Sequence, residues 1–158
     1  MQKVISKSLL FLILLLTVSC GYKVLNETEE NKFSIQAIRT TGDKRINFKI
    51  KNDLINSAKK NNENILSIDL NTKKTKSIKE KNIRNEITKY EILLEVDIRF
   101  NLINTNENYK IILANKGEYL VVESYSATLN NEKKLIDDLI ASLSEKIQKK
   151  ISQKLNDI

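Results

Sequence analysis

The alternation of apolar and polar residues from Tyr90 to Leu102 limits what this chain can fold into. Every even position in this stretch is apolar or aromatic, whereas the odd positions are mostly polar, as at Glu91, Asp97 and Arg99. Side chains on a β-strand point alternately to opposite faces, so the pattern predicts one long strand between a core and water. Because strands are usually about five or six residues long, such a strand already favours an extended sheet.

Shorter patterns predict three more strands around it. Residues 33–37 and 66–70 alternate in the same way. Residues 109–126 predict a strand that is interrupted at Gly117 by a bulge or a short excursion, because a glycine inside a strand often marks a bulge. The polar stretch 104–108 predicts a hairpin turn between the two long strands.

Two segments have the apolar spacing of amphipathic helices. Apolar residues recur every three or four positions over residues 46–58 and over residues 130–158. We expect a turn over residues 40–43, with Thr41 or Asp43 as the cap of the first helix. The second helix is expected to begin at Asn130, and its last turns are expected to project past the domain because the apolar stripe narrows there.

The resulting β-α-β-β-β-α order predicts a two-layer α/β sandwich. A helix between the first two strands can cross over the sheet, so these strands are expected to pair in parallel. The two long strands are expected to pair as an antiparallel hairpin. Both helices would then cover one face of a four-stranded mixed sheet. We expect residues 33–158 to form a single α/β domain.

The first twenty residues have the features of an export signal. Lys3 and Lys7 precede the apolar run Leu9–Leu16, and small or hydroxyl side chains lead up to Cys20. The run is shorter than the roughly twenty residues that span a membrane. We therefore expect residues 1–19 to be a signal peptide and residues 20–32 to be a tether. A buried core helix or an uncleaved anchor is the alternative interpretation.

Cys20 is the only cysteine of the chain, which excludes an intramolecular disulfide and a thiolate zinc site. Ser19-Cys20-Gly21 resembles the lipobox of bacterial lipoproteins, although Thr17 replaces the usual leucine. The resemblance implies that Cys20 is lipidated and becomes the N-terminus, and several acyl chains give stable anchoring. Gly21 replaces the aspartate that retains such proteins in the inner membrane. We therefore expect a lipid anchor in the outer membrane and a chain on its periplasmic side.

The composition disfavours an enzyme. The chain has no histidine, so a nucleophilic serine would need a lysine or carboxylate base. With only three glycines there is no glycine-rich phosphate loop. Glu91, Glu95 and Asp97 are better explained as the solvated face of a strand than as a carboxylate site. We expect an interaction module without cofactor or metal; an enzyme with a lysine- or carboxylate-based site is the alternative.

Residues 73–84 carry the strongest local charge. The segment is expected to be a solvated loop or an extended strand end, and its cations could bind the phosphates of an anionic lipid. Lysines of a solvated loop are the simpler alternative. The overall excess of positive charge is modest and does not require a nucleic-acid partner. The candidate ligand-binding residues are Lys73, Lys74, Lys76, Lys79, Lys81 and Arg84.

The stretches Ser19–Tyr22 and Ile87–Leu102 are similar to the opening and the central strand of LptE, the lipopolysaccharide (LPS) assembly lipoprotein family. The order of elements, Gly117, Tyr125 and the closing helix follow the same pattern. The resemblance implies a non-enzymatic plug inside the LPS-translocating β-barrel LptD, in contact with LPS. The chain departs from the family in lacking proline, and no family ligand residue is carried over. The alternative is an envelope lipoprotein that binds lipid or peptidoglycan without a barrel partner.

Overall fold

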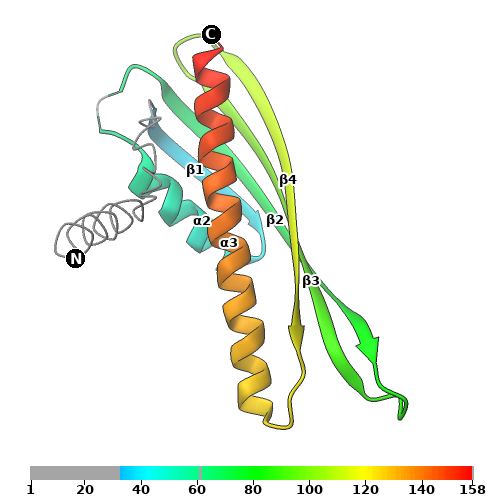
Figure 1. The fold of residues 1–158 in the computed structure, drawn as a ribbon. Helices are drawn as coiled ribbons and strands as arrows, with labels where there is room; N and C mark the ends of the chain where they lie inside the picture. Colours follow the sequence, from blue (N-terminus) through cyan, green and yellow to red (C-terminus); the bar gives the residue numbers. More distant parts are fainter. Residues whose placement is uncertain (1–32, 61, 158) are drawn as a thin grey trace, which may run out of the picture.

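The computed structural model describes residues 33–60 and 62–157, which form one sheet covered by two helices (Figure 1). The expected signal peptide (1–19), Cys20 and the tether (20–32) lie outside the described residues. The four strands follow the order β1-β2-β3-β4 across the sheet, and both helices lie on one face of it. The predicted two-layer α/β sandwich is therefore confirmed. The elements are β1 (Ser34–Gly42), α2 (Lys44–Ser57), β2 (Ile65–Lys81), β3 (Ile87–Leu102), β4 (Glu107–Leu120) and α3 (Tyr125–Asn156).

The pairing of the strands divides the sheet into two ends. β1 pairs in parallel with β2, whereas β2–β3 and β3–β4 are antiparallel, as predicted. The β1–β2 pairing stops at Gly42 and Thr72, so only β2, β3 and β4 continue beyond it. We call the end where β1 begins the proximal end. The distal end carries the β2–β3 turn and the start of α3 (Figure 1).

The transition from β1 to α2 depends on Gly42 and Asp43. The Asp43 carboxylate accepts hydrogen bonds from two backbone N–H groups of the first helical turn, so Asp43 is the cap and Thr41 is not. The turn expected at residues 40–43 is wrong, because β1 keeps its pairing with β2 as far as Gly42. Gly42 has a φ of 92°, and a Cβ there would overlap the carbonyl oxygen of Thr72. Only glycine fits at this position.

The predicted bulge at Gly117 is wrong. β4 pairs with β3 without a register shift, and Gly117 lies opposite Ile92. A Cβ at Gly117 would press against the side chain of Leu135 on α3. The glycine therefore allows α3 to pack closely on an unbroken strand, and it does not mark an irregularity of the backbone.

Helix α3 begins earlier than predicted and is packed at its C-terminal end. Ser124 caps the helix through its side-chain oxygen, so Tyr125 opens α3 and does not belong to the strand. The expectation that the last turns project is also wrong. Ile147, Ile151 and Leu155 are all buried, and they hold these turns on the proximal half of the sheet.

The core lies between the helices and one face of the sheet, and the other face is open and polar. The even positions of β3 point into the core, as the alternation predicted. Phe100 stacks on Tyr109 of β4, with ring centroids 5.1 Å apart. The largest fully buried side chains are Phe33, Phe100, Ile46, Ile50, Leu54, Leu66, Ile68, Leu70, Ile92, Leu94, Ile98 and Leu143.

Candidate functional site

The basic segment 73–84 is mostly strand, so the solvated-loop interpretation is wrong and the strand-end interpretation is correct. Because side chains alternate along β2, the segment is divided between two faces. Lys74 pairs with Leu94 of β3, and Lys76 pairs with Ile92. Both partners are buried, so the two lysines lie on the face that carries the helices. Lys73, one residue earlier, lies on the open face. The predicted cluster is therefore not one surface.

The lysines on the open face have carboxylate partners. Lys73 Nζ lies 3.8 Å from Glu95, and Lys79 Nζ lies 3.5 Å from Glu91 and 3.3 Å from Glu118. Hydrogen bonding to Glu118, followed by the charge of Glu91, raises the pKa of Lys79. Exposed pairs of this kind contribute little, about 0–1 kcal/mol each. This part of the segment is the solvated side of a half-buried sheet.

Lys81 and Arg84 belong to the β2–β3 turn region at the distal end. Lys81 Nζ donates to the Asn85 side chain at 2.9 Å, and the Arg84 backbone N–H donates to the Asn82 side chain at 2.9 Å. Asn85 has a φ of 63°, a conformation that asparagine tolerates in turns. Ile83 lies at the tip of this turn and is fully exposed.

Lys76 forms a compact cluster with residues that sequence reasoning missed. Its Nζ lies 2.7 Å from Glu132 of α3, which also accepts a hydrogen bond from the Tyr119 hydroxyl at 2.8 Å. The same ammonium lies 4.3 Å from the Tyr90 ring centroid, and the two tyrosine rings stack at 5.6 Å. Cation–π and charge-assisted contacts therefore attach the start of α3 to the sheet. The sequence could have suggested this cluster, because Lys76, Tyr90 and Tyr119 lie on the same face of adjacent strands.

Burial and hydrogen bonding have opposite effects on the pKa values of Lys76 and Glu132. Burial alone would raise the pKa of Glu132, but the hydrogen bonds from Lys76 and Tyr119 outweigh it and hold the pKa below the usual value. Burial would likewise lower the pKa of Lys76, and the contacts with Glu132 raise it overall. For Tyr119, burial is the main cause of a raised pKa. Lys76 and Glu132 are therefore a charged pair at neutral pH.

We expect Glu132→Gln to destabilise the fold by about 1–3 kcal/mol at pH 7, because it removes the charged partner of Lys76 and Tyr119. The lowered pKa of Glu132 means that its contribution is present above pH 4.5 and is lost as the pH falls through the folded-state value. Urea unfolding at pH 7 and pH 3 measures the difference. Glu95→Gln is the control, since the exposed Lys73–Glu95 pair should contribute under about 0.5 kcal/mol. If Glu132→Gln lowered the free energy of unfolding equally at both pH values, the charged Lys76–Glu132 pair would be contradicted.

Several large apolar side chains are exposed at the distal end, where Arg84 follows Ile83 in the turn, and Lys74 lies four residues before Ile78 on β2. Lys74 lies on β2, two residues before Lys76, and Arg84 lies in the turn beyond it. Exposed apolar groups beside cations can contact acyl chains and lipid phosphates together. We call these residues the distal surface: Lys74, Ile78, Ile83, Arg84, Val122, Tyr125 and Leu129.

The carboxylates of the open face are paired with basic side chains. Glu91 contacts Lys79 and Lys116, and Asp97 contacts Lys110 at 3.2 Å. Within residues 33–60 and 62–157, no three His, Cys, Asp or Glu side chains are arranged to hold a metal ion. Over the same residues, neither helix combines the length and the apolar character needed to cross a membrane.

The fold defines a class of two-layer proteins in which a β-α-β unit is followed by a long hairpin and a closing helix. Solved structures with this fold include two lipoproteins. Rare lipoprotein B of Shewanella oneidensis matches with a TM-score of 0.58 at 14% identity, over 76% of this chain and 97% of that one. Lipoprotein B of Nitrosomonas europaea matches with a TM-score of 0.54 at 14% identity, over 87% and 94%. At such identity the likeness shows the fold.

Comparisons by sequence give no further relatives. No family model matches the chain. No curated protein matches it either.

Proposed function

We propose that this chain is an outer-membrane lipoprotein that acts as plug and assembly partner of an LPS-translocating β-barrel and helps insert LPS into the outer membrane. The observation that carries the proposal is the fold, which extends over nearly the full length of two proteins named lipoprotein B. The lipobox-like Ser19-Cys20-Gly21 and the sequence resemblance to the LptE family support the same function. The proposed role is binding and needs neither a catalytic group nor a cofactor.

Purification of the tagged full chain from detergent-solubilised envelopes tests the barrel partner. The proposal expects a stoichiometric outer-membrane β-barrel protein to copurify with the chain and to be absent from an untagged control. Recovery of the chain alone would instead favour an envelope lipoprotein that binds lipid or peptidoglycan without such a partner.

The distal surface is the part of the molecule that we assign to LPS or other anionic lipid. Lys74 is exposed and has Ile78 on the same face of β2, so a phosphate and an acyl chain could be bound together. Lys76 already pairs with Glu132 and Lys81 donates to Asn85, which leaves Lys74 and Arg84 as the cations for a ligand. This assignment keeps only part of the basic segment that the sequence suggested.

Lys74→Glu is expected to weaken binding to LPS micelles about tenfold, whereas Lys73→Glu should change it less than about twofold. The two residues are neighbours with the same charge, and only Lys74 lies on the same face of β2 as the exposed Ile78. Binding is measured at low and at physiological salt, because unspecific charge attraction is screened at the higher salt. Equal losses in both variants would contradict a face-specific site.

A further inference from the structure

The open face of the sheet carries a row of charged residues that crosses all four strands in its proximal half. The pairing registers place Arg39, Asp69, Arg99 and Lys110 directly next to one another on β1, β2, β3 and β4. Three of these side chains are cationic and one is anionic. Directly opposite side chains on a sheet lie close enough to act on one ligand.

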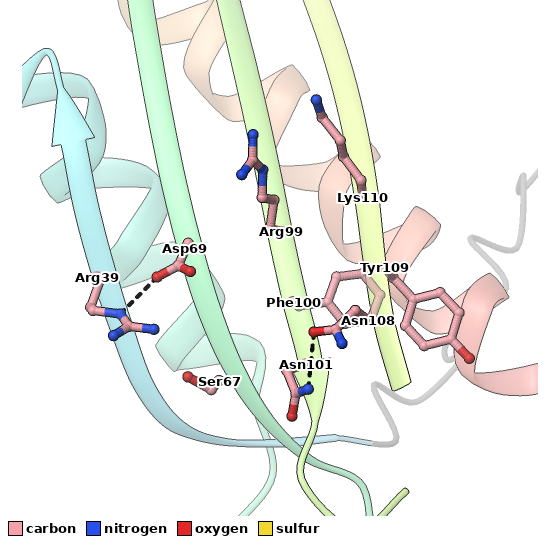
Figure 2. A pocket seen from close by; sticks show the side chains of 9 residues that line it. All are labelled: Arg39, Ser67, Asp69, Arg99, Phe100, Asn101, Asn108, Tyr109 and Lys110. Carbon is pink, nitrogen blue, oxygen red and sulfur yellow. Dashed lines mark hydrogen bonds and ion pairs between the residues drawn. The ribbon is translucent and has the colours of Figure 1, made fainter. Parts of the chain in front are cut away.

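A second row of hydrogen-bonding side chains runs beside the first, nearer the proximal end. It consists of Ser67, Asn101 and Asn108, and the two amides are joined by a hydrogen bond of 3.0 Å. A groove of about 510 Å³ lies over both rows. Figure 2 shows Arg99 between Asp69 and Lys110 on the neighbouring strands, with the Asn101–Asn108 pair further along β3 and β4. The groove therefore offers positive charge on one side and neutral donors and acceptors on the other.

Some nitrogen donors of the groove's cations have no hydrogen-bond partner within the described part of the protein. Arg39 Nε donates to Asp69 at 2.8 Å, which leaves its terminal nitrogens for other partners. Lys110 Nζ lies 3.2 Å from Asp97, whereas Arg99 Nε lies 3.9 Å from the same carboxylate. That distance is too long for a hydrogen bond. The Arg99 guanidinium thus keeps its planar set of donors for an oxyanion.

On the remainder of the open face the lysines are balanced by carboxylates, which distinguishes it from this groove. Towards the distal end, Lys73 faces Glu95 and Lys79 lies between Glu91 and Glu118. Lys116 also contacts Glu91. At the proximal groove, by contrast, the cations Arg39, Arg99 and Lys110 outnumber the carboxylates Asp69 and Asp97 by one.

We propose that this groove binds an anionic saccharide, namely a sugar that carries a phosphate or a carboxylate. Arg99 and Lys110 would hold the anionic group, and Arg39 would contribute its free terminal nitrogens. Asp69 and the amides of Asn101 and Asn108 would bond the hydroxyl groups of the ring. A polar groove of this volume is within the range of small-ligand sites. The site is distinct from the distal surface and does not depend on the proposed barrel partner.

The full chain in detergent is titrated with glucose 1-phosphate, glucose and inorganic phosphate, and backbone amide shifts are followed by NMR. The proposal expects saturable shifts around the groove with glucose 1-phosphate, and much weaker ones with glucose or phosphate alone. The double variant Arg39→Gln/Arg99→Gln should weaken binding at least about tenfold. Lys116→Gln, another exposed cation of the open face, should leave it unchanged.

A second titration with rough LPS micelles in the Lys74→Glu background distinguishes a lipid-linked sugar from a free one. Binding of micelles that depends on Arg39 and Arg99, without binding of glucose 1-phosphate, would support the groove with a lipid-linked ligand. Inorganic phosphate that binds as well as the sugar phosphate would overturn the saccharide assignment. Equal binding by the double variant and by Lys116→Gln, for both ligands, would overturn the site itself.

Discussion

Cys20→Ala should move the full chain from the detergent phase to the aqueous phase when a Triton X-114 extract is warmed. Each acyl chain contributes about 0.8 kcal/mol per buried methylene, so loss of the lipid removes many kcal/mol of membrane affinity. Phase partitioning reports the lipid itself, because a barrel partner could hold an unlipidated chain at the membrane. Incorporation of labelled palmitate should be lost in parallel.

Ser19→Ala is the matched control for this experiment, because it changes the neighbouring residue and keeps the thiol. It should remain in the detergent phase and keep its label. A Cys20→Ala chain that still enters the detergent phase would show that the apolar run Leu9–Leu16 is retained as an anchor and is not cleaved. The thermal unfolding of the α/β domain should be the same in both variants, since Cys20 lies outside residues 33–157.

Gly42→Ala is expected to destabilise the domain by about 3 kcal/mol or more, and so to lower the urea midpoint strongly. The backbone at Gly42 has a φ of 92°, which L-residues rarely adopt, and the new methyl group would overlap the carbonyl oxygen of Thr72. Neither strain can relax locally, because Thr72 pairs with β3 and Asp43 caps α2. The β1–α2 crossover would therefore have to shift as a whole.

Gly117→Ala provides the comparison. A methyl group there meets only the end of the Leu135 side chain, which can rotate away, and the φ of Gly117 is not positive. We expect a cost of about 1 kcal/mol, within the lower range for overpacking. Similar urea midpoints for the two variants would mean that the end of β1 at Gly42 tolerates a side chain and that the steric account is wrong.

Sequence periodicity predicted the sheet well, because the burial of one face forces a period of two. The alternation in β3 predicted its buried face correctly, and the crossover rule predicted the parallel pairing of β1 and β2. The errors arose where local signals are weak. Residues 121–129 have no clear helical spacing, so the Ser124 cap and the first turns of α3 were missed. At Gly117 the sequence could not show that the Leu135 side chain occupies the position where a Cβ would lie.

The candidate site was harder to predict than the fold. A run of cations from Lys73 to Arg84 looks like one cluster in the sequence, but strand geometry separates adjacent residues onto opposite faces. The partner of Lys76 lies on α3, far along the chain, at Glu132. The groove at Arg99 joins residues from four strands, and only the pairing registers bring them together. Such long-range proximity is determined by topology and not by local patterns.

The long strands place the two ends of the sheet far apart. β2 alone has 17 residues, which at about 3.3 Å per residue corresponds to roughly 55 Å. The described chain begins at Phe33, beside Lys59 and Asn64 at the proximal end, whereas Ile83 marks the far tip. This length is comparable to the roughly 40–45 Å thickness of a bilayer with its headgroups. The place where the described chain begins and the β2–β3 turn are thus separated by a distance of the order of a membrane's thickness.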